Sequence, residues 1–196
     1  LLDVHGMPDR DTANACFRAL GEGKQVLVSM TATTAADVIE DLLDLGITGK
    51  QLGKHLRGIL CSRLVRRVCP QCAESYRPPP VVLDRVGLAG DERDGPFVRG
   101  VGCAHCQQRG HLGRSLIYDC FQPSTAFWDE LAGADREATI LPVAERHGLI
   151  TMRAVALHKV AQGLLDIADL GATLPSIYLP AEAGQGGPPP TAREPE

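Results

Sequence analysis

Residues 69–72 read Cys-Pro-Gln-Cys and residues 103–106 read Cys-Ala-His-Cys. A gap of two residues lets both thiolates of a pair reach one metal ion, and two such pairs complete the tetrahedral four-sulfur shell that zinc prefers. Four coordinated thiolates leave no open position on the ion, so a structural role is expected. The predicted zinc ligands are Cys69, Cys72, Cys103 and Cys106.

The interval between the two pairs, residues 73–102, is longer than the about 15–20 residues of the common zinc pattern. This objection is weak, because doubling a loop adds only about 0.6 kcal/mol of closure entropy. Structural zinc binding contributes roughly 10–16 kcal/mol in small fingers. Two alternatives stay open here, namely two disulfides or four unrelated buried thiols. His105 and His111 lie close by in sequence and could replace one cysteine ligand.

The composition excludes several classes of protein. The formal net charge of -4 gives no general attraction to nucleic acid or anionic membranes. No secretory signal is visible, and no apolar run reaches the about 18 residues needed to span a bilayer. A reducing compartment is therefore expected, where paired cysteines indicate metal or redox chemistry. The single cysteines Cys16, Cys61 and Cys120 fall in helix or strand patterns and are predicted to be small core residues.

The first thirty residues predict a strand, a helix and a second strand. Residues 1–4 are a short apolar strand, and residues 11–20 place apolar side chains at helical spacing before Gly21. Residues 25–30 (QVLVSM) are typical of a strand buried on both faces. This order favours a βαβ unit with a parallel sheet. Because the chain begins with Leu1 rather than Met, we interpret it as a fragment.

Two further helices are predicted before the first cysteine pair. One begins with Thr34 as its N-cap and ends at Gly46, with Asp37 in the first turn. The other is predicted from about Lys50 to Val68, closed by Pro70. One side of this second helix would be apolar, and the other would carry Lys50, Lys54, Arg57, Arg63, Arg66 and Arg67. Such a basic face could bind phosphates or acidic lipid, although charged helical faces are more often simply solvated.

After the second cysteine pair, residues 115–121 predict a strand. Helices are expected near residues 125–131, 142–147, 152–163 and 165–170. From Pro180 onward the chain is rich in Pro, Gly and charged residues and is predicted to be disordered.

The order of these motifs resembles the ATPases of type II secretion and type IV pilus assembly. In that family a Leu-Arg-Gly stretch and a Gln-Arg-Leu-Val-Arg stretch lead into a Cys-Pro-x-Cys knuckle, which residues 56–72 match closely. The second knuckle also fits, through Gly102-Cys103 and then Gly113-Arg114 and Ile117-Tyr118. Residues 147–149 (HGL) and 158–160 (HKV) match the C-terminal helices. The resemblance covers roughly residues 1–170.

The resemblance implies an α/β fold, in which the C-terminal part of a RecA-like P-loop NTPase core is followed by a small zinc-binding subdomain and C-terminal helices. The implied division is residues 1–68 for the core, 69–121 for the zinc subdomain, 122–179 for the helical region and 180–196 for a disordered tail. The implied function is to power or support pilus or pseudopilus assembly and protein secretion. The implied assembly is a homo- or hetero-hexameric ring, cytoplasmic and peripheral to the inner membrane, that acts on membrane platform proteins.

The chain departs from the family pattern at positions that matter for catalysis. Where the family has Gly-Glu after the Walker B strand, this sequence has His5-Gly6, so the catalytic carboxylate is missing. The His of the family's Thr-Leu-His-Thr-Asn box is Ala32 here. No phosphate loop exists in the chain to hold ATP and Mg²⁺, and one would have to lie upstream of Leu1. We therefore predict a degenerate motor subunit, with no catalytic or nucleotide-binding residues in this chain, that does not hydrolyse ATP alone.

Two other functions are alternatives to this one. A zinc-knuckle adaptor or nucleic-acid-binding module is disfavoured by the acidic balance and by the lack of aromatic residues near the knuckles. A redox protein is disfavoured because two distant pairs match a metal cage better than one dithiol. Asp9 and Asp11 suggest a metal pair, but Asp11 is better explained as a helix N-terminal residue.

Overall fold

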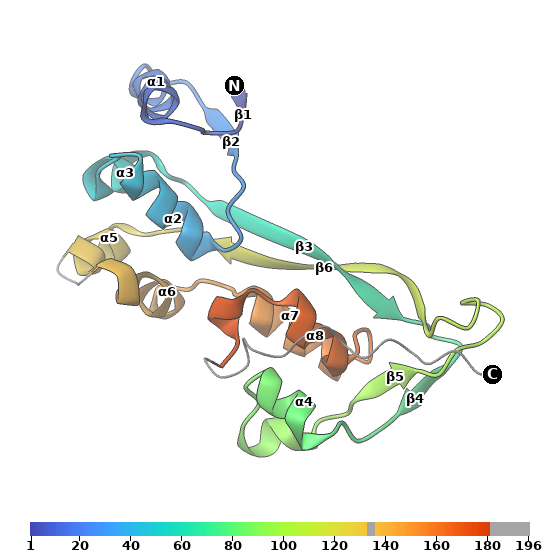
Figure 1. The fold of residues 1–196 in the computed structure, drawn as a ribbon. Helices are drawn as coiled ribbons and strands as arrows, with labels where there is room; N and C mark the ends of the chain where they lie inside the picture. The colour runs from blue at the N-terminus through green and yellow to red at the C-terminus, as the bar shows by residue number, and fades with distance from the viewer. Residues whose placement is uncertain (133–135, 181–196) are drawn as a thin grey trace. The chain divides into compact units, whose positions relative to one another are not determined.

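The computed structural model describes residues 1–132 and 136–180 (Figure 1). The chain forms two compact units, each made of two segments. The first unit comprises Leu1–Leu64 and Leu116–Val155, and the second comprises Val65–Ser115 and Ala156–Glu196. Both contain helices and strands, so the mixed α/β class is confirmed.

The first unit begins with the predicted βαβ arrangement. Strand β1 (Leu2–His5) pairs in parallel with β2 (Val26–Ser29), and helix α1 (Arg10–Gly21) connects them. Asp9 is the N-cap of α1, because its carboxylate accepts a 2.7 Å hydrogen bond from the Thr12 amide. Asp11 lies in the first turn, as expected for an acid near the positive end of a helix.

The prediction that β2 is buried on both faces is wrong. Leu27 is 60% exposed, and the burial of β2 alternates along the strand. In the described part of the chain this sheet has only two strands, and α1 buries just Ala13 and Cys16. A parallel pair is normally covered on both sides, and here that cover is incomplete.

Helix α2 (Ala35–Asp44) follows the predicted boundaries. Thr34 is its N-cap and forms a capping box with Asp37, which satisfies amide groups that the helix cannot bond itself. Ile39 and Leu42 are buried, and Gly46, with a φ of 83°, ends the helix. Helix α3 (Gly49–His55) is capped in the same way by Thr48 and Gln51.

The predicted helix from Lys50 to Val68 is wrong beyond His55. Residues Ile59–Val68 form strand β3, and Pro70 follows a strand rather than a helix. The burial of β3 alternates at its start, with Ile59 and Cys61 inside and Leu60 exposed. A single basic helical face therefore does not exist, because Lys50 and Lys54 lie on α3 whereas the arginines from Arg63 onward lie on β3.

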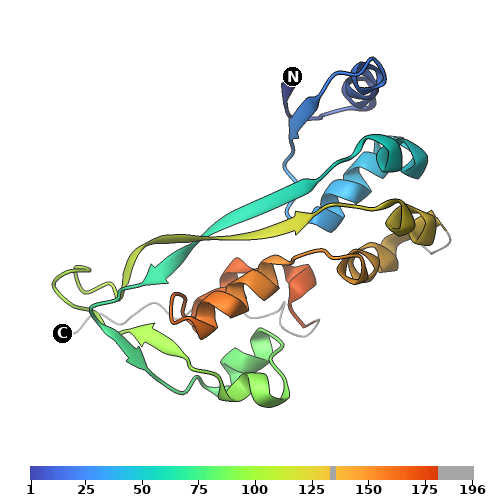
Figure 2. The ribbon, with the colours of Figure 1, turned by 180° about the vertical axis from the view of Figure 1, so that it is seen from behind.

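Strand β3 pairs with β6 (His111–Phe121), which contains the predicted strand 115–121. The two strands lie side by side in both views (Figures 1 and 2). Each strand begins in one unit and ends in the other. On β6, Ile117, Asp119 and Phe121 are buried and Cys120 is exposed. The prediction that Cys120 is a core residue is therefore wrong, whereas Cys16 and Cys61 are buried as predicted.

Helices α5 (Thr125–Ala132), α6 (Arg136–Arg146) and α7 (Met152–Ala161) follow β6. Helix α6 begins earlier than predicted and contains Pro142 within it. Phe127 forms the aromatic core of the first unit, with ring centroids 5.0 Å from Phe121 and 4.8 Å from Trp128. This small cluster compensates for the scarcity of aromatic residues by placing three of them together.

The interval between the cysteine pairs has its own secondary structure (Figure 2). Its elements are β4 (Ala73–Ser75), α4 (Pro80–Arg85), a 3₁₀ turn (Gly90–Asp94) and β5 (Val98–Gly100). Strands β4 and β5 pair antiparallel, and α4 packs against α8 (Ile167–Thr173). A last 3₁₀ turn spans Ser176–Tyr178. The two cysteine pairs therefore lie at the two ends of a segment that has its own secondary structure.

None of the helices in the part of the chain that the structure describes is both long and apolar enough to cross a bilayer. The tail predicted to be disordered is residues 180–196, and all of it except Pro180 lies outside the described residues.

Candidate metal centre

The structure brings the four predicted cysteines together in the second unit. Their Sγ atoms all lie within 4.8 Å of one another. The Sγ–Sγ distances are 3.9 Å for Cys69–Cys103, 3.9 Å for Cys72–Cys106 and 3.7 Å for Cys103–Cys106. A tetrahedral ion with bonds of about 2.3 Å separates its sulfur ligands by about 3.8 Å. These three distances match the spacing around one zinc-sized ion, and the whole group is close enough together to hold a metal ion.

The same distances exclude the disulfide alternative. A disulfide requires sulfurs about 2.0 Å apart, and all seven cysteines are free. Four unrelated buried thiols are excluded as well, because the sulfurs converge on one point. The group could hold a metal ion.

The first knuckle is formed where β3 ends. The Cys69 amide donates to the carbonyl of Gly110 at 2.9 Å, and the Cys72 amide donates to the Cys69 carbonyl at 3.3 Å. The first bond joins the two knuckles through the backbone. The second closes the tight turn that places both sulfurs of the pair on the same side.

The second knuckle depends on unusual backbone angles. Gln107 and Gln108 have φ values of 55° and 62°, in the left-handed region that side chains other than glycine rarely adopt. Gly110, with a φ of 70°, then turns the chain into β6. A Cβ atom on Gly100 would lie 1.8 Å from the Gly110 carbonyl oxygen. Glycine is therefore required at position 100, because the two backbone segments touch.

Two backbone amides point at the sulfur of Cys106. Cys106 Sγ accepts hydrogen bonds from the amides of Cys103, at 3.3 Å, and Gly110, at 3.2 Å. Burial on its own would raise the pKa of the Cys106 thiol, but these amides and the neighbouring thiols lower it to about 6. At Cys72 burial dominates and raises the pKa. Deprotonation is thus easier at Cys106 than at Cys72, and a bound cation would favour the thiolate form.

The cluster is closed to solvent on most sides. Cys69 and Cys106 are fully buried, Cys72 is nearly so, and Cys103 is half-buried with Leu112 packed against it. Nothing in this arrangement leaves a place for a substrate. The geometry therefore suits a structural ion better than a catalytic one.

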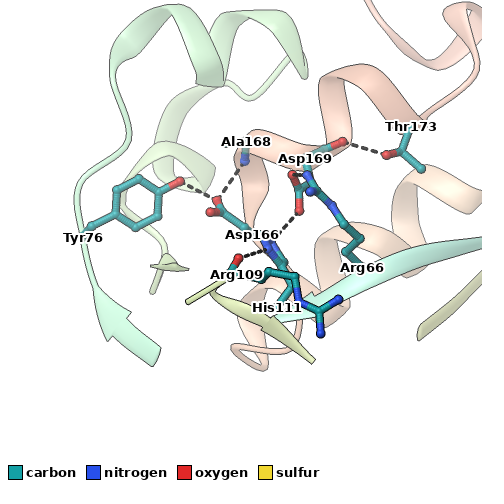
Figure 3. A network of polar contacts seen from close by, with 8 residues as sticks. All are labelled: Arg66, Tyr76, Arg109, His111, Asp166, Ala168, Asp169 and Thr173. Atoms are coloured by element: carbon teal, nitrogen blue, oxygen red, sulfur yellow. Dashed lines mark hydrogen bonds and ion pairs between the residues drawn. The ribbon is translucent and has the colours of Figure 1, made fainter. Parts of the chain in front are cut away.

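Neither neighbouring histidine belongs to the sulfur cluster. His105 is exposed. His111 faces away, with Nδ1 3.0 Å from the Arg109 carbonyl oxygen and Nε2 3.0 Å from a carboxylate oxygen of Asp169 (Figure 3). The ligand set among the described residues is therefore four cysteines.

A polar network next to the cluster was not predicted from the sequence. Asp169 also accepts a 2.6 Å hydrogen bond from Arg66, which lies on β3 shortly before the first knuckle (Figure 3). Asp166, the N-cap of α8, accepts a 2.6 Å bond from the hydroxyl of Tyr76. Burial, together with the Asp166 carboxylate, raises the pKa of Tyr76 above its ordinary value. The chain on both sides of the first knuckle, and His111 after the second, thus contacts α8 or its N-cap.

The positions at which the resemblance predicted missing catalytic groups lie in the first unit. His5 is exposed at the end of β1, with Nε2 3.7 Å from a carboxylate oxygen of Asp3. Ala32 lies between β2 and α2. Asp9 and Asp11 are accounted for by the start of α1. Among the described residues, the four cysteines are the only group of three or more His, Cys, Asp or Glu side chains that could hold a metal ion.

Comparisons with known proteins place these features in one family. The family described as Type II/IV secretion system protein matches residues 4–172. A type IV pilus assembly ATPase PilB from Thermus thermophilus is 29% identical over 171 residues, which cover 87% of this chain and 19% of that protein. The PilB of Myxococcus xanthus is 32% identical over 182 residues, covering 87% of this chain and 31% of its own length.

A type II secretion system protein E from Pseudomonas aeruginosa is 36% identical over 112 residues, covering 57% of this chain and 22% of the relative. The chain thus spans between about a fifth and a third of the length of the curated relatives it matches.

Proposed function

The chain belongs to the Type II/IV secretion system protein family, and on that premise we propose that it is the zinc-stabilised C-terminal part of a motor ATPase for type II secretion or type IV pilus assembly. The observation that carries the proposal is the convergence of four cysteine sulfurs, at the spacing of a tetrahedral ion, within a chain that matches this family over most of its length. The names of the relatives support the motor role, since they are pilus assembly ATPases and a secretion system protein.

The proposed metal is zinc, held by Cys69, Cys72, Cys103 and Cys106. Four thiolates in a tetrahedron are a set that zinc favours, and the buried site suits a structural ion. The ion would join the end of β3 to the start of β6 and so hold the two ends of the intervening segment together. No catalytic residue is proposed for this chain.

The first part of the chain, residues 1–68, is proposed to be the C-terminal portion of a RecA-like core. The parallel pair β1 and β2 with its connecting helix supports this, because such units build doubly wound α/β sheets. Residues 69–121 are proposed to form the zinc subdomain, and residues 122–179 the helical region. The incomplete cover of β2 agrees with a sheet that continues in the whole protein.

Nucleotide chemistry is proposed to be weak or absent. No phosphate loop lies in this chain, so ATP and Mg²⁺ would have to be held by residues upstream of Leu1. His5-Gly6 and Ala32 replace the family's Glu and His, which leaves no evident group to orient attacking water. The whole protein is proposed to act as a degenerate subunit of a homo- or hetero-hexameric ring, at the cytoplasmic face of the inner membrane, in contact with platform proteins.

Metal analysis tests the structural half of the proposal. The chain purified under reducing conditions is expected to contain one equivalent of zinc by plasma mass spectrometry. Cys106→Ser is expected to lose the metal, whereas Cys120→Ser is the matched control and is expected to keep it, because Cys120 is exposed and outside the cluster. A metal-free, fully folded wild-type chain contradicts the assignment.

Nucleotide assays on the full-length natural protein test the motor half. We expect ATP turnover well below that of an active relative assayed in parallel. Turnover equal to the active relative would refute the degenerate assignment. Absence of any ring in native mass spectrometry, with and without nucleotide, would refute the proposed assembly.

A further inference from the structure

Asp119 is a fully buried carboxylate on β6 that the metal centre does not use. Its exposed fraction is 0%. One oxygen accepts a hydrogen bond from the amide of Ala35 at 2.9 Å, and the other accepts one from the amide of Met152 at 2.6 Å. These amides belong to the first residues of α2 and α7. One side chain thus binds the starts of two helices far apart in sequence.

The two helix starts are built alike. Each has a threonine cap, since Thr34 Oγ1 accepts from the Asp37 amide at 3.2 Å and Thr151 Oγ1 accepts from the Ala154 amide at 3.2 Å. A cap residue reaches only the second or third amide of its helix. The first amide of each helix is left over, and in both cases the Asp119 carboxylate binds it. The positive ends of the two helix dipoles also favour an anion at this point.

The segment before α2 is closed by a second carboxylate. One oxygen of Asp37 accepts from the amides of Thr33, at 3.1 Å, and Thr34, at 2.9 Å. With the Ala35–Asp119 bond, three successive amides are bound by carboxylates of the chain itself. Successive amides at a helix start are otherwise a ready binding site for phosphate. Here that site is already filled by side chains.

The bound amides lie close to the carboxyl end of a parallel strand. The segment 30–34 leaves the carboxyl end of β2. In open parallel α/β sheets, ligands bind outside the carboxyl ends of the strands. We propose that Asp119 is a positioning residue. Together with Asp37 it holds the segment 30–34 in one conformation whether or not a ligand is present. It also prevents phosphate groups from binding the amides at the start of α2. The expectation of a nucleotide nearby rests on the proposed function, but the closure does not.

Hydrogen exchange at single amides in the full-length protein tests the proposal. First-residue amides of a helix normally exchange quickly, because they have no partner within the helix. We expect the amides of Ala35 and Met152 to be protected about 10- to 100-fold in the unmodified protein, as a bond to a buried charged group implies. Addition of ATP with Mg²⁺ is expected to change the protection at Thr33, Thr34 and Ala35 by less than about twofold, since no phosphate contacts them.

Two variants separate positioning from general stability. Asp119→Asn, which keeps the shape but removes the charge, is expected to lower protection at both Ala35 and Met152 by about tenfold while amides within α1 stay unchanged. Asp129→Asn is the matched control, an exposed acid in the same unit, and is expected to change neither. If protection is lost equally across the first unit, Asp119 acts only through general stability, and the proposal is overturned.

The unmodified protein decides the matter even if Asp119→Asn does not fold. Unprotected Ala35 and Met152 amides overturn the proposal, and so does a large gain of protection at Thr33–Ala35 with nucleotide. Binding of nucleotide to the full protein is measured separately by calorimetry. Absence of binding agrees with the degenerate subunit of the proposed function, whose failure is read from the zinc content and the ring, and the protection of the two amides without ligand is judged separately.

Discussion

Replacement of Gly100 by alanine is the sharpest test of how the knuckles are built. The added Cβ would lie 1.8 Å from the carbonyl oxygen, 2.6 Å from the carbonyl carbon and 2.7 Å from the Cα of Gly110. All three are backbone atoms, so no flexible side chain can move aside. The Gly110 carbonyl must shift, and it is the acceptor for the Cys69 amide. The Gly110 amide, which donates to Cys106 Sγ, must shift with it.

The expected loss of stability has two parts. Overpacking of a tight contact costs about 1–3 kcal/mol, and the broken backbone bond adds about 0.5–1.5 kcal/mol. We therefore expect Gly100→Ala to destabilise the second unit by about 2–4 kcal/mol. We also expect weaker retention of the metal, because the two knuckles no longer present their sulfurs at the same spacing.

The assay combines urea unfolding with release of zinc to a coloured chelator. Gly95→Ala is the matched control in the same unit, since its Cβ would meet the Glu92 carbonyl oxygen at an ordinary 3.5 Å. The control is expected to stay close to wild type in both measurements. If Gly100→Ala unfolds and releases zinc like the control, the close approach of the two backbones is not what holds the knuckles together.

Three further predictions concern the first unit. Phe127→Ala removes the fully buried ring at the centre of the aromatic cluster and is expected to cost about 3–5 kcal/mol in urea unfolding, and a loss below about 1 kcal/mol would contradict that placement. Thr48→Ala removes the cap of α3 and is expected to cost about 0.5–1 kcal/mol, whereas Thr48→Ser should be nearly neutral in the same assay. Hydrogen bonds from Arg146 and then His147 lower the pKa of Glu130 below its ordinary 4.5. The folded state therefore gains stability from this carboxylate above that value and loses it as the pH falls through the lowered pKa. Unfolding measured between about pH 3 and 6 should show this acid dependence reduced in Glu130→Gln, and an unchanged profile would rule out the contribution.

Local sequence signals predicted the parts of the fold that are themselves local. The start of α2 was visible because Thr34 is a typical N-cap residue and Asp37 is an acid in the first turn. The metal centre was visible because a two-residue gap constrains a cysteine pair regardless of what lies between the pairs. Thr34 and Asp37, like the two members of each cysteine pair, are three positions apart, whereas the meeting of the two pairs 34 positions apart was inferred from the chemistry of zinc.

Strand β3 shows why the rest could not be predicted. A helical spacing of aliphatic residues extends by chance across the true end of α3. These residues are Leu52, Leu56, Ile59, Leu60 and Leu64. The strand forms because it pairs with β6, whose residues lie about fifty positions further along the chain, and a pairing of that kind overrides local propensity. The alternation of Ile59 and Cys61 with exposed Leu60 was the available signal.

The buried acids were missed for a related reason. Asp119 stands between Tyr118 and Cys120 on a strand, where an isolated acid would normally be read as solvent-facing. Its partners are the backbone amides of Ala35 and Met152, which leave no trace in the sequence. Asp166 offered one clue, since an acid directly before an apolar helical run is a typical cap.

Because Cys120 is exposed, the number of thiols that react with a dye should report whether the proposed metal site is occupied. With zinc bound, four thiols are coordinated and Cys16 and Cys61 are buried, so a thiol-reactive dye should label Cys120 alone. Removal of the ion would uncover the coordinated sulfurs and raise the number of labelled sites on each molecule. Counting attached dye by intact-mass spectrometry would then report the loaded fraction directly, without any engineered tag.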